Sequence, residues 1–126
     1  EIYLKGFSIC IERSQPAALM TSYNLLNGEH TSERRDLLED VLRAEFGFDG
    51  VVMTDWVITL MTGKNRKYRD PEAYRVSAAG GDLFMPGRKK DYESILFALR
   101  SGVLSRKQLE ENVTRICRLA ERLNQG

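Results

Sequence analysis

Asp55 and Trp56 directly follow a short run of β-branched and apolar residues, and their types and position could support chemistry. In a parallel α/β sheet, ligands bind at the carboxyl ends of the strands. A carboxylate at such a point can serve as a base, a metal ligand or a nucleophile. The ring of Trp56, with the ring and hydroxyl of Tyr23 after an earlier apolar run, suits a carbohydrate, because sugars stack through their C–H faces and hydrogen-bond at their edges. The alternative interpretation is that Asp55 caps a local loop or helix.

Three apolar segments bounded by turn residues predict the strands that would position these side chains. They cover residues 17–21, 50–54 and 82–85, and each is interpreted as a buried strand. Helical patterns surround them at residues 1–13, 32–46, 70–79, 91–100 and 105–123. Strands that alternate with helices predict an α/β fold with parallel strands and right-handed crossovers. Three strands alone would leave open apolar edges, so we expect part of a larger α/β domain such as a barrel.

Local signals refine these boundaries. Residues 70–72 (Asp-Pro-Glu) predict a helix start. Ser105 predicts an N-cap, with Gln108 completing a capping box. The connection at residues 22–30 is interpreted as a polar loop, in which Asn27-Gly28 suits a turn with positive φ. The buried face of the last helix is predicted to consist of Leu109, Val113, Ile116, Ala120 and Leu123.

The composition is that of a folded domain without a strongly charged partner. Of 126 residues, 42% are hydrophobic and 29% charged, and 19 Lys and Arg nearly balance 18 Asp and Glu. No single-signed field therefore points to nucleic acid or a membrane surface, and no apolar run approaches the roughly 20 residues that cross a bilayer. His30, Cys10 and Cys117 lack ligand spacing, so we expect neither a metal nor a cofactor. The sequence does not indicate a compartment.

The stretch from Leu19 to Trp56 resembles the barrel domain of glycoside hydrolase family 3, which includes many β-glucosidases and β-xylosidases. The matching motifs follow the family's order and are Thr21-Ser22-Tyr23-Asn24 with Asn27-Gly28, Leu37-Leu38 with Val41-Leu42-Arg43, Phe46-Gly47-Phe48-Asp49-Gly50, and Thr54-Asp55-Trp56. Residues 78–87, AAGGDLFMPG, are similar to the family's A-G-x-D-x-x-M-P strand. The resemblance covers nearly the whole chain and implies the later βα units of a TIM-type (β/α)8-like barrel.

The resemblance also implies roles for individual residues. Asp55 matches the family's catalytic nucleophile, which attacks the anomeric carbon in a retaining, double-displacement hydrolysis of terminal β-linked sugars. Trp56 matches an aromatic wall near the leaving-group subsite, Tyr23 matches the tyrosine close to the nucleophile and the bound sugar, and Met20 is expected to line the same pocket. A retaining enzyme holds two carboxyl groups about 5–5.5 Å apart. A phenol hydroxyl that donates to the nucleophile would favour its ionised form.

The second carboxyl group of the family has no matching position in this chain. In many members the acid/base glutamate lies in a domain or loop that follows the barrel, and residues of earlier strands hold the glycone. Five glutamates fall instead in loop or solvated helix patterns: Glu29, Glu33, Glu45, Glu110 and Glu111. We therefore expect residues 1–126 to be a single fragment of the family's N-terminal barrel domain, inactive alone. Its expected partners are a carbohydrate substrate and the remainder of the parent chain, which would supply the earlier strands and the acid/base domain.

Two other functions stay open. A relative that binds carbohydrate without cleaving it would share the fold and differ only in turnover. Residues 91–100 and the helix after Ser105 could instead form a helix-turn-helix that contacts nucleic-acid phosphates, although glutamates interrupt its basic face. Its phosphate-contacting residues would be Arg106, Lys107, Arg115, Arg118 and Arg122. The basic residues 64–69 are interpreted as a solvated loop.

Overall fold

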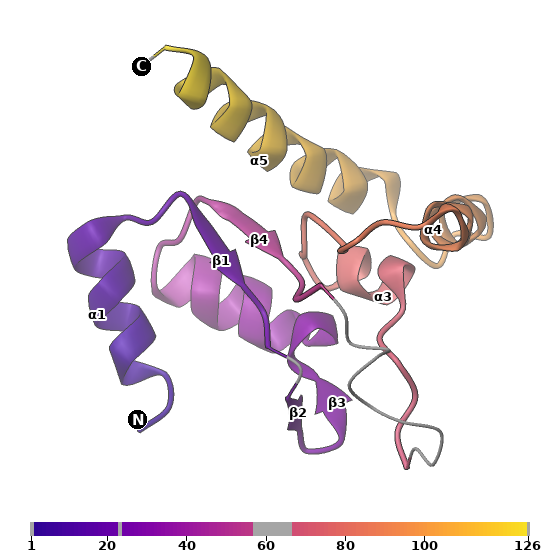
Figure 1. Cartoon of the computed structure of the whole chain (residues 1–126), viewed down its shortest axis with the longest axis horizontal. Coiled ribbons are helices and arrows are strands. Elements are labelled where there is room, and N and C mark those ends of the chain that lie inside the picture. Colours follow the sequence, from indigo (N-terminus) through magenta and orange to yellow (C-terminus); the bar gives the residue numbers. More distant parts are fainter. Residues whose placement is uncertain (1, 23, 57–66, 126) are drawn as a thin grey trace.

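The computed structural model describes residues 2–22, 24–56 and 67–125, and Figure 1 shows helices arranged around a short pair of strands. These strands, β1 (Ala18–Met20) and β4 (Val51–Met53), are parallel, with Ala18 opposite Val51 and Met20 opposite Met53. A third segment joins through one parallel bridge between Leu83 and Met53. The predicted α/β class with parallel strands is therefore confirmed.

The predicted strand at 82–85 is shorter than expected, because a side chain replaces a backbone carbonyl as the hydrogen-bond acceptor for its last residue. The N–H of Thr54 donates to the carbonyl oxygen of Leu83 at 2.9 Å. Beyond that point the hydroxyl of Thr54, not a backbone carbonyl, accepts the N–H of Met85 at 2.8 Å. The segment thus stays attached to the end of β4 without forming a regular strand.

The two paired strands differ in burial. Val51 and Val52 of β4 are each 1% exposed, as predicted for a covered parallel strand. In β1, by contrast, Ala18 and Met20 are exposed, so the prediction of a buried strand at 17–21 is wrong for this chain. Among the described strands only β4 pairs with β1, and the other edge of β1 is therefore open.

Two helices pack on one face of the strand pair and enclose the main core. They are α1 (Lys5–Ser14) and η2, a π-helix at Asp36–Glu45, which follows the single 3-10 turn η1 (Thr31–Glu33). The apolar spacing predicted for the second helix brings Leu38 and Leu42 into that core. The core cluster contains Ile11, Leu38, Leu42, Phe48, Val52 and Ala79, with Leu19 and Phe46 packed against it.

The connection after β1 contains a small hairpin that the sequence pattern did not predict. Its strands are β2 (Leu25–Leu26) and β3 (Glu29–His30), which pair antiparallel. Asn27 and Gly28 have φ values of 53° and 88°, so the predicted positive-φ turn is confirmed and has the form of a two-residue type I′ hairpin.

Three helices complete the described chain: α3 (Ala73–Ala78), α4 (Lys89–Arg100) and α5 (Arg106–Asn124), and α3 packs against both of the others. The first begins later than the predicted start at 70–72. Glu72 is extended, because its N–H donates to the carboxylate of Glu33 at 2.7 Å. The predicted N-cap of α5 is confirmed, since the Ser105 hydroxyl accepts the N–H of Gln108 at 3.1 Å. Within the described chain, no helix is both long and apolar enough to cross a membrane.

The buried face of α5 is polar, which corrects the predicted apolar stripe. Val113 and Leu123 are 48% and 72% exposed, whereas Gln108 and Asn112 are buried. The Gln108 side chain also does not complete the capping box, because it bonds instead to Arg35 and Glu39 outside α5 and to Asn112 one turn further along α5. The surface beneath α5 presents backbone carbonyls and a carboxylate, so polar side chains face it.

Candidate active site

Thr54, the residue directly before the candidate nucleophile Asp55, is held firmly at the end of β4. Thr54 is 1% exposed and is bonded through both its N–H and its hydroxyl to the segment at Leu83 and Met85. Asp55 follows immediately, so the direction in which its side chain leaves the sheet is set by this buried threonine. The sequence analysis assigned no role to Thr54, although its place directly before Asp55 could have indicated one.

Asp55 is half-buried at the carboxyl end of β4. Its Oδ1 accepts the N–H of Trp56 at 2.7 Å, which is the local bond that a capping interpretation requires. Within residues 2–22, 24–56 and 67–125, no hydrogen bond is made to Oδ2. One oxygen is thus oriented by the backbone, and the described part of the chain leaves the other without a partner.

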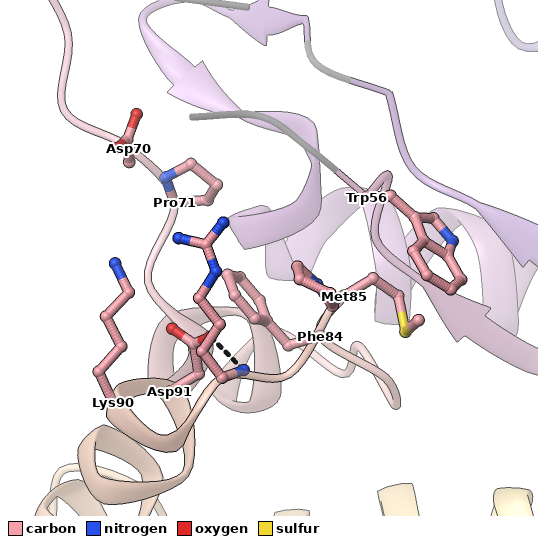
Figure 2. A pocket seen from close by; sticks show the side chains of 9 residues that line it. Trp56, Asp70, Pro71, Phe84, Met85, Lys90 and Asp91 are labelled. Carbon is pink, nitrogen blue, oxygen red and sulfur yellow. Dashed lines mark hydrogen bonds between the residues drawn. The ribbon is translucent and has the colours of Figure 1, made fainter. Parts of the chain in front are cut away.

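Trp56 is 52% exposed and lines a pocket of about 50 Å³. Figure 2 shows Trp56 and Met85 on one side of this pocket and Asp70 and Pro71 on the other. The full lining is Trp56, Asp70, Pro71, Phe84, Met85, Pro86, Arg88, Lys90 and Asp91. Asp55 does not line the pocket but directly precedes its aromatic wall. Arg88, Lys90 and Asp91, around the start of α4, were not predicted from the sequence to lie near the site.

Met20 and Tyr23 were predicted to accompany Asp55. Met20 ends β1 and is paired with Met53 of β4, and Asp55 follows Met53 by two positions. Met20 and Asp55 therefore lie at the carboxyl ends of neighbouring strands, at one edge of the sheet. Its side chain is 52% exposed. Tyr23 lies outside the described residues, and its position beside the nucleophile stays a prediction.

A buried carboxylate supports β4 from the other end. Asp82 has a fully buried side chain that accepts hydrogen bonds from the N–H of Val52 at 2.7 Å, from Arg43 at 2.9 Å and from Arg115 at 2.8 Å. Burial lowers the pKa of Arg43, and the nearby Arg115 adds to that shift, while Asp82 and Glu39 oppose it. Arg43 also donates to the carbonyl of Gly50 at 3.0 Å, before β4 begins. This network holds the amino end of the strand.

A second polar cluster lies near the pocket and was not expected from the sequence. Arg69 donates from both terminal nitrogens to the two carboxylate oxygens of Glu33, and this bond raises the pKa of Arg69. His30 is 5% exposed, and its Nε2 is 2.8 Å from the carbonyl oxygen of Arg69. Arg69 is exposed, as predicted for a solvated loop, but its guanidinium is bonded to Glu33, while residues 64–66 of that predicted loop lie outside the described residues. His30 is a buried hydrogen-bonding residue. Among the described residues, no cluster of His, Cys, Asp and Glu could hold a metal.

All five cations assigned to the helix-turn-helix alternative lie on α5. Several of these are paired within the chain. Arg106 bonds Glu110 at 2.7 Å, and Lys107 lies 3.7 Å from Glu111. Arg115 bonds the buried Asp82, and Arg122 bonds Asp49 on the turn before β4.

Comparison with known proteins places this geometry in a family. Residues 1–119 match the family model described as the glycosyl hydrolase family 3 N terminal domain. The chain belongs to glycoside hydrolase family 3. This family 3 chain is 38% identical over 126 residues to β-glucosidase B of Emericella nidulans, covering 98% of the chain and 14% of that protein.

Solved structures agree with this assignment. The family 3 β-glucosidase of Bifidobacterium adolescentis superposes with a TM-score of 0.79 at 32% identity, covering 94% of this chain and 16% of that one. The β-glucosidase 3B of Thermotoga neapolitana in complex with glucose gives 0.78 at 36% identity, covering 92% of this chain and 16% of that one. The chain thus spans about one-seventh of the length of these family 3 proteins.

Proposed function

We propose that the natural polypeptide carrying this chain is a retaining β-glycosidase of the β-glucosidase type, with Asp55 as its nucleophile. The observation that carries the proposal is the state of Asp55: a half-buried carboxylate at a strand end, held by one hydrogen bond at Oδ1 and followed by an exposed tryptophan. Membership of family 3 and the names of the similar β-glucosidases support the same reaction class.

The reaction would proceed in two displacements. An Asp55 carboxylate oxygen attacks the anomeric carbon, and the bond from that carbon to the leaving-group oxygen breaks as an acid donates a proton to that oxygen. Water then attacks the glycosyl ester, releases the sugar and restores the carboxylate. Trp56 would stack on the leaving group, Met20 would line the sugar pocket, and Tyr23 would donate to the nucleophile.

The acid/base group is proposed to come from outside these 126 residues, so the chain would be inactive alone. Three of its glutamates are already engaged with cations: Glu33 binds Arg69, Glu110 binds Arg106 and Glu111 lies near Lys107. We likewise propose that residues 1–126 are one part of a barrel, which other strands of the natural polypeptide complete.

The test is Asp55→Asn in the natural polypeptide, with Asp49→Asn as a matched control on the exposed turn before β4. We expect the first variant to lose on the order of 10³-fold or more in kcat and the control to keep wild-type activity. A 2-fluoro glycoside, which traps the glycosyl ester, should label Asp55. Labelling of another carboxylate would refute the assigned nucleophile. Sugar binding by a wild-type protein that turns over no glycoside would favour the non-catalytic relative instead.

A further inference from the structure

Two segments far apart in the sequence are joined beside the candidate site. Arg69 binds Glu33 with both of its terminal nitrogens, in the bidentate arrangement that makes such pairs strong and directional. The same carboxylate accepts the N–H of Glu72 at 2.7 Å. His30, from the hairpin just before Glu33, adds a hydrogen bond to the carbonyl oxygen of Arg69. We call Glu33, Arg69 and His30 the clamp.

The clamp is more than a surface ion pair. The Glu33 side chain is 6% exposed and His30 is 5% exposed, whereas the Arg69 side chain is 46% exposed, so the ion pair is shielded from water on the Glu33 side only. Surface pairs contribute little because solvent screens them, whereas loss of the Arg69 guanidinium would leave a nearly buried Glu33 carboxylate without its charged partner. The ring of Tyr68 also lies close over Gly28 in the hairpin turn, where an added Cβ would be 3.6 Å from it. The segment at 68–72 is therefore held against the hairpin at several points.

This attachment determines one wall of the pocket. Asp70 and Pro71 stand between Arg69 and Glu72, the two residues that Glu33 holds. Both line the pocket across from Trp56, as Figure 2 shows. The distance between this wall and Trp56 therefore depends on bonds made by Glu33, which does not itself line the pocket.

We propose that Glu33 is a positioning residue: acting through Arg69, it fixes the Asp70–Pro71 wall opposite Trp56 and so sets how the enzyme depends on its leaving group. This inference rests on the proposed function, in which Trp56 faces the leaving group. The leaving group is present only until the glycosyl ester forms. A displaced wall should therefore slow formation of the ester with a bulky leaving group and spare its hydrolysis.

The test compares three variants of the natural polypeptide. Glu33→Gln removes the charge, and Arg69→Lys keeps the charge but loses the two-pronged bond. Glu110→Gln makes the same change in an exposed pair on α5. Hydrogen exchange of the peptide covering 67–75 reports on the clamp without any substrate. Activity is measured on two substrates with one glycone, a glycosyl fluoride and a nitrophenyl glycoside, because fluoride is too small to reach the wall.

Glu33→Gln and Arg69→Lys should each accelerate exchange at 67–75 and lower kcat/KM for the nitrophenyl glycoside by roughly tenfold. The kcat/KM for the fluoride should change less than about twofold, and Glu110→Gln should behave as wild type. Unchanged hydrogen exchange at 67–75 in both variants would show that Glu33 and Arg69 do not hold this segment in place. Faster exchange with equal losses on both substrates would show a merely structural role and overturn the positioning assignment. A wild-type protein that cleaves neither substrate would overturn the proposed function and this role with it, while the exchange data would still decide whether the clamp exists.

Discussion

The side-chain amide of Asn112 on α5 donates a hydrogen bond to the carbonyl oxygen of Gly81 at 3.1 Å. The same amide donates to Ser77 at 2.9 Å, and its oxygen accepts bonds from Gln108 and Arg115. All four hydrogen-bonding positions of this 1%-exposed side chain are thus occupied. The long last helix is attached to the rest of the molecule by bonds of fixed direction.

Asn112→Ala should lower the free energy of unfolding by about 2–4 kcal/mol, because it leaves buried carbonyls without donors. The measurement is the urea midpoint of the protein. Asn124→Ala, at the exposed end of the same helix, is the matched control and should leave the midpoint nearly unchanged. Equal midpoints for the two variants would show that this buried amide does not stabilise the fold.

Asp82→Asn should be more damaging, with a loss of about 3–5 kcal/mol. The substitution keeps an oxygen for the N–H of Val52 but removes the charge that compensates the nearly buried Arg43 and Arg115. Thermal unfolding provides the readout. Asp49→Asn, which loses an exposed partner in Arg122, should have little effect. A thermally stable Asp82→Asn variant would contradict the assigned role of the network.

Two glycine substitutions should change stability in opposite directions. At Gly50 a Cβ would come 2.6 Å from the carbonyl oxygen of Ala17, so Gly50→Ala should force β1 away from β4 and cost about 1–3 kcal/mol. Gly6, near the start of α1, has no atom within 4 Å of the same position. Gly6→Ala should therefore stabilise by roughly 0.5–1 kcal/mol. Chemical denaturation of both variants distinguishes these outcomes from a uniform effect of added methyl groups.

Trp56→Ala should weaken use of glycosides with aromatic leaving groups, if Trp56 stacks on them as proposed. We expect kcat/KM in the natural polypeptide to fall roughly tenfold, with Trp56→Phe intermediate because it keeps a smaller ring. Tyr92→Ala removes an exposed ring from α4 outside the pocket and should leave kcat/KM unchanged. Wild-type kinetics in Trp56→Ala would remove this residue from the site.

The sequence predicted the elements whose signals are local and continuous. The β-branched run before Asp55 predicted β4, and the Ser105 cap predicted the start of α5. The paired strands of the hairpin are only two residues long, too short for an alternating pattern, so only their Asn27-Gly28 turn was visible.

Contacts between distant residues could not be predicted in the same way. The apolar periodicity of α5 placed Leu109 and Ile116 in partly buried positions but missed its buried residues, Gln108 and Asn112, because the surface beneath that helix offers carbonyls and a carboxylate. The bond between Glu33 and Arg69 joins residues 36 positions apart, and the residue types alone do not indicate which glutamate pairs with which arginine. A further bond to Glu33, from the N–H of Glu72, explains why the helix with a predicted start at 70–72 begins only at Ala73.

Strand β4 therefore has ends with different tolerance to mutation. Its amino end is anchored by a charged network in which a single substitution leaves other charges unpaired. Its carboxyl end leads to Asp55 and Trp56, which support few contacts within the described chain. Genetic variation should consequently fall into two separable groups, one that abolishes accumulation of the protein and one that alters catalysis in a protein still produced in full. Substrate preference could diversify among descendants of this sequence without eroding the domain that carries it.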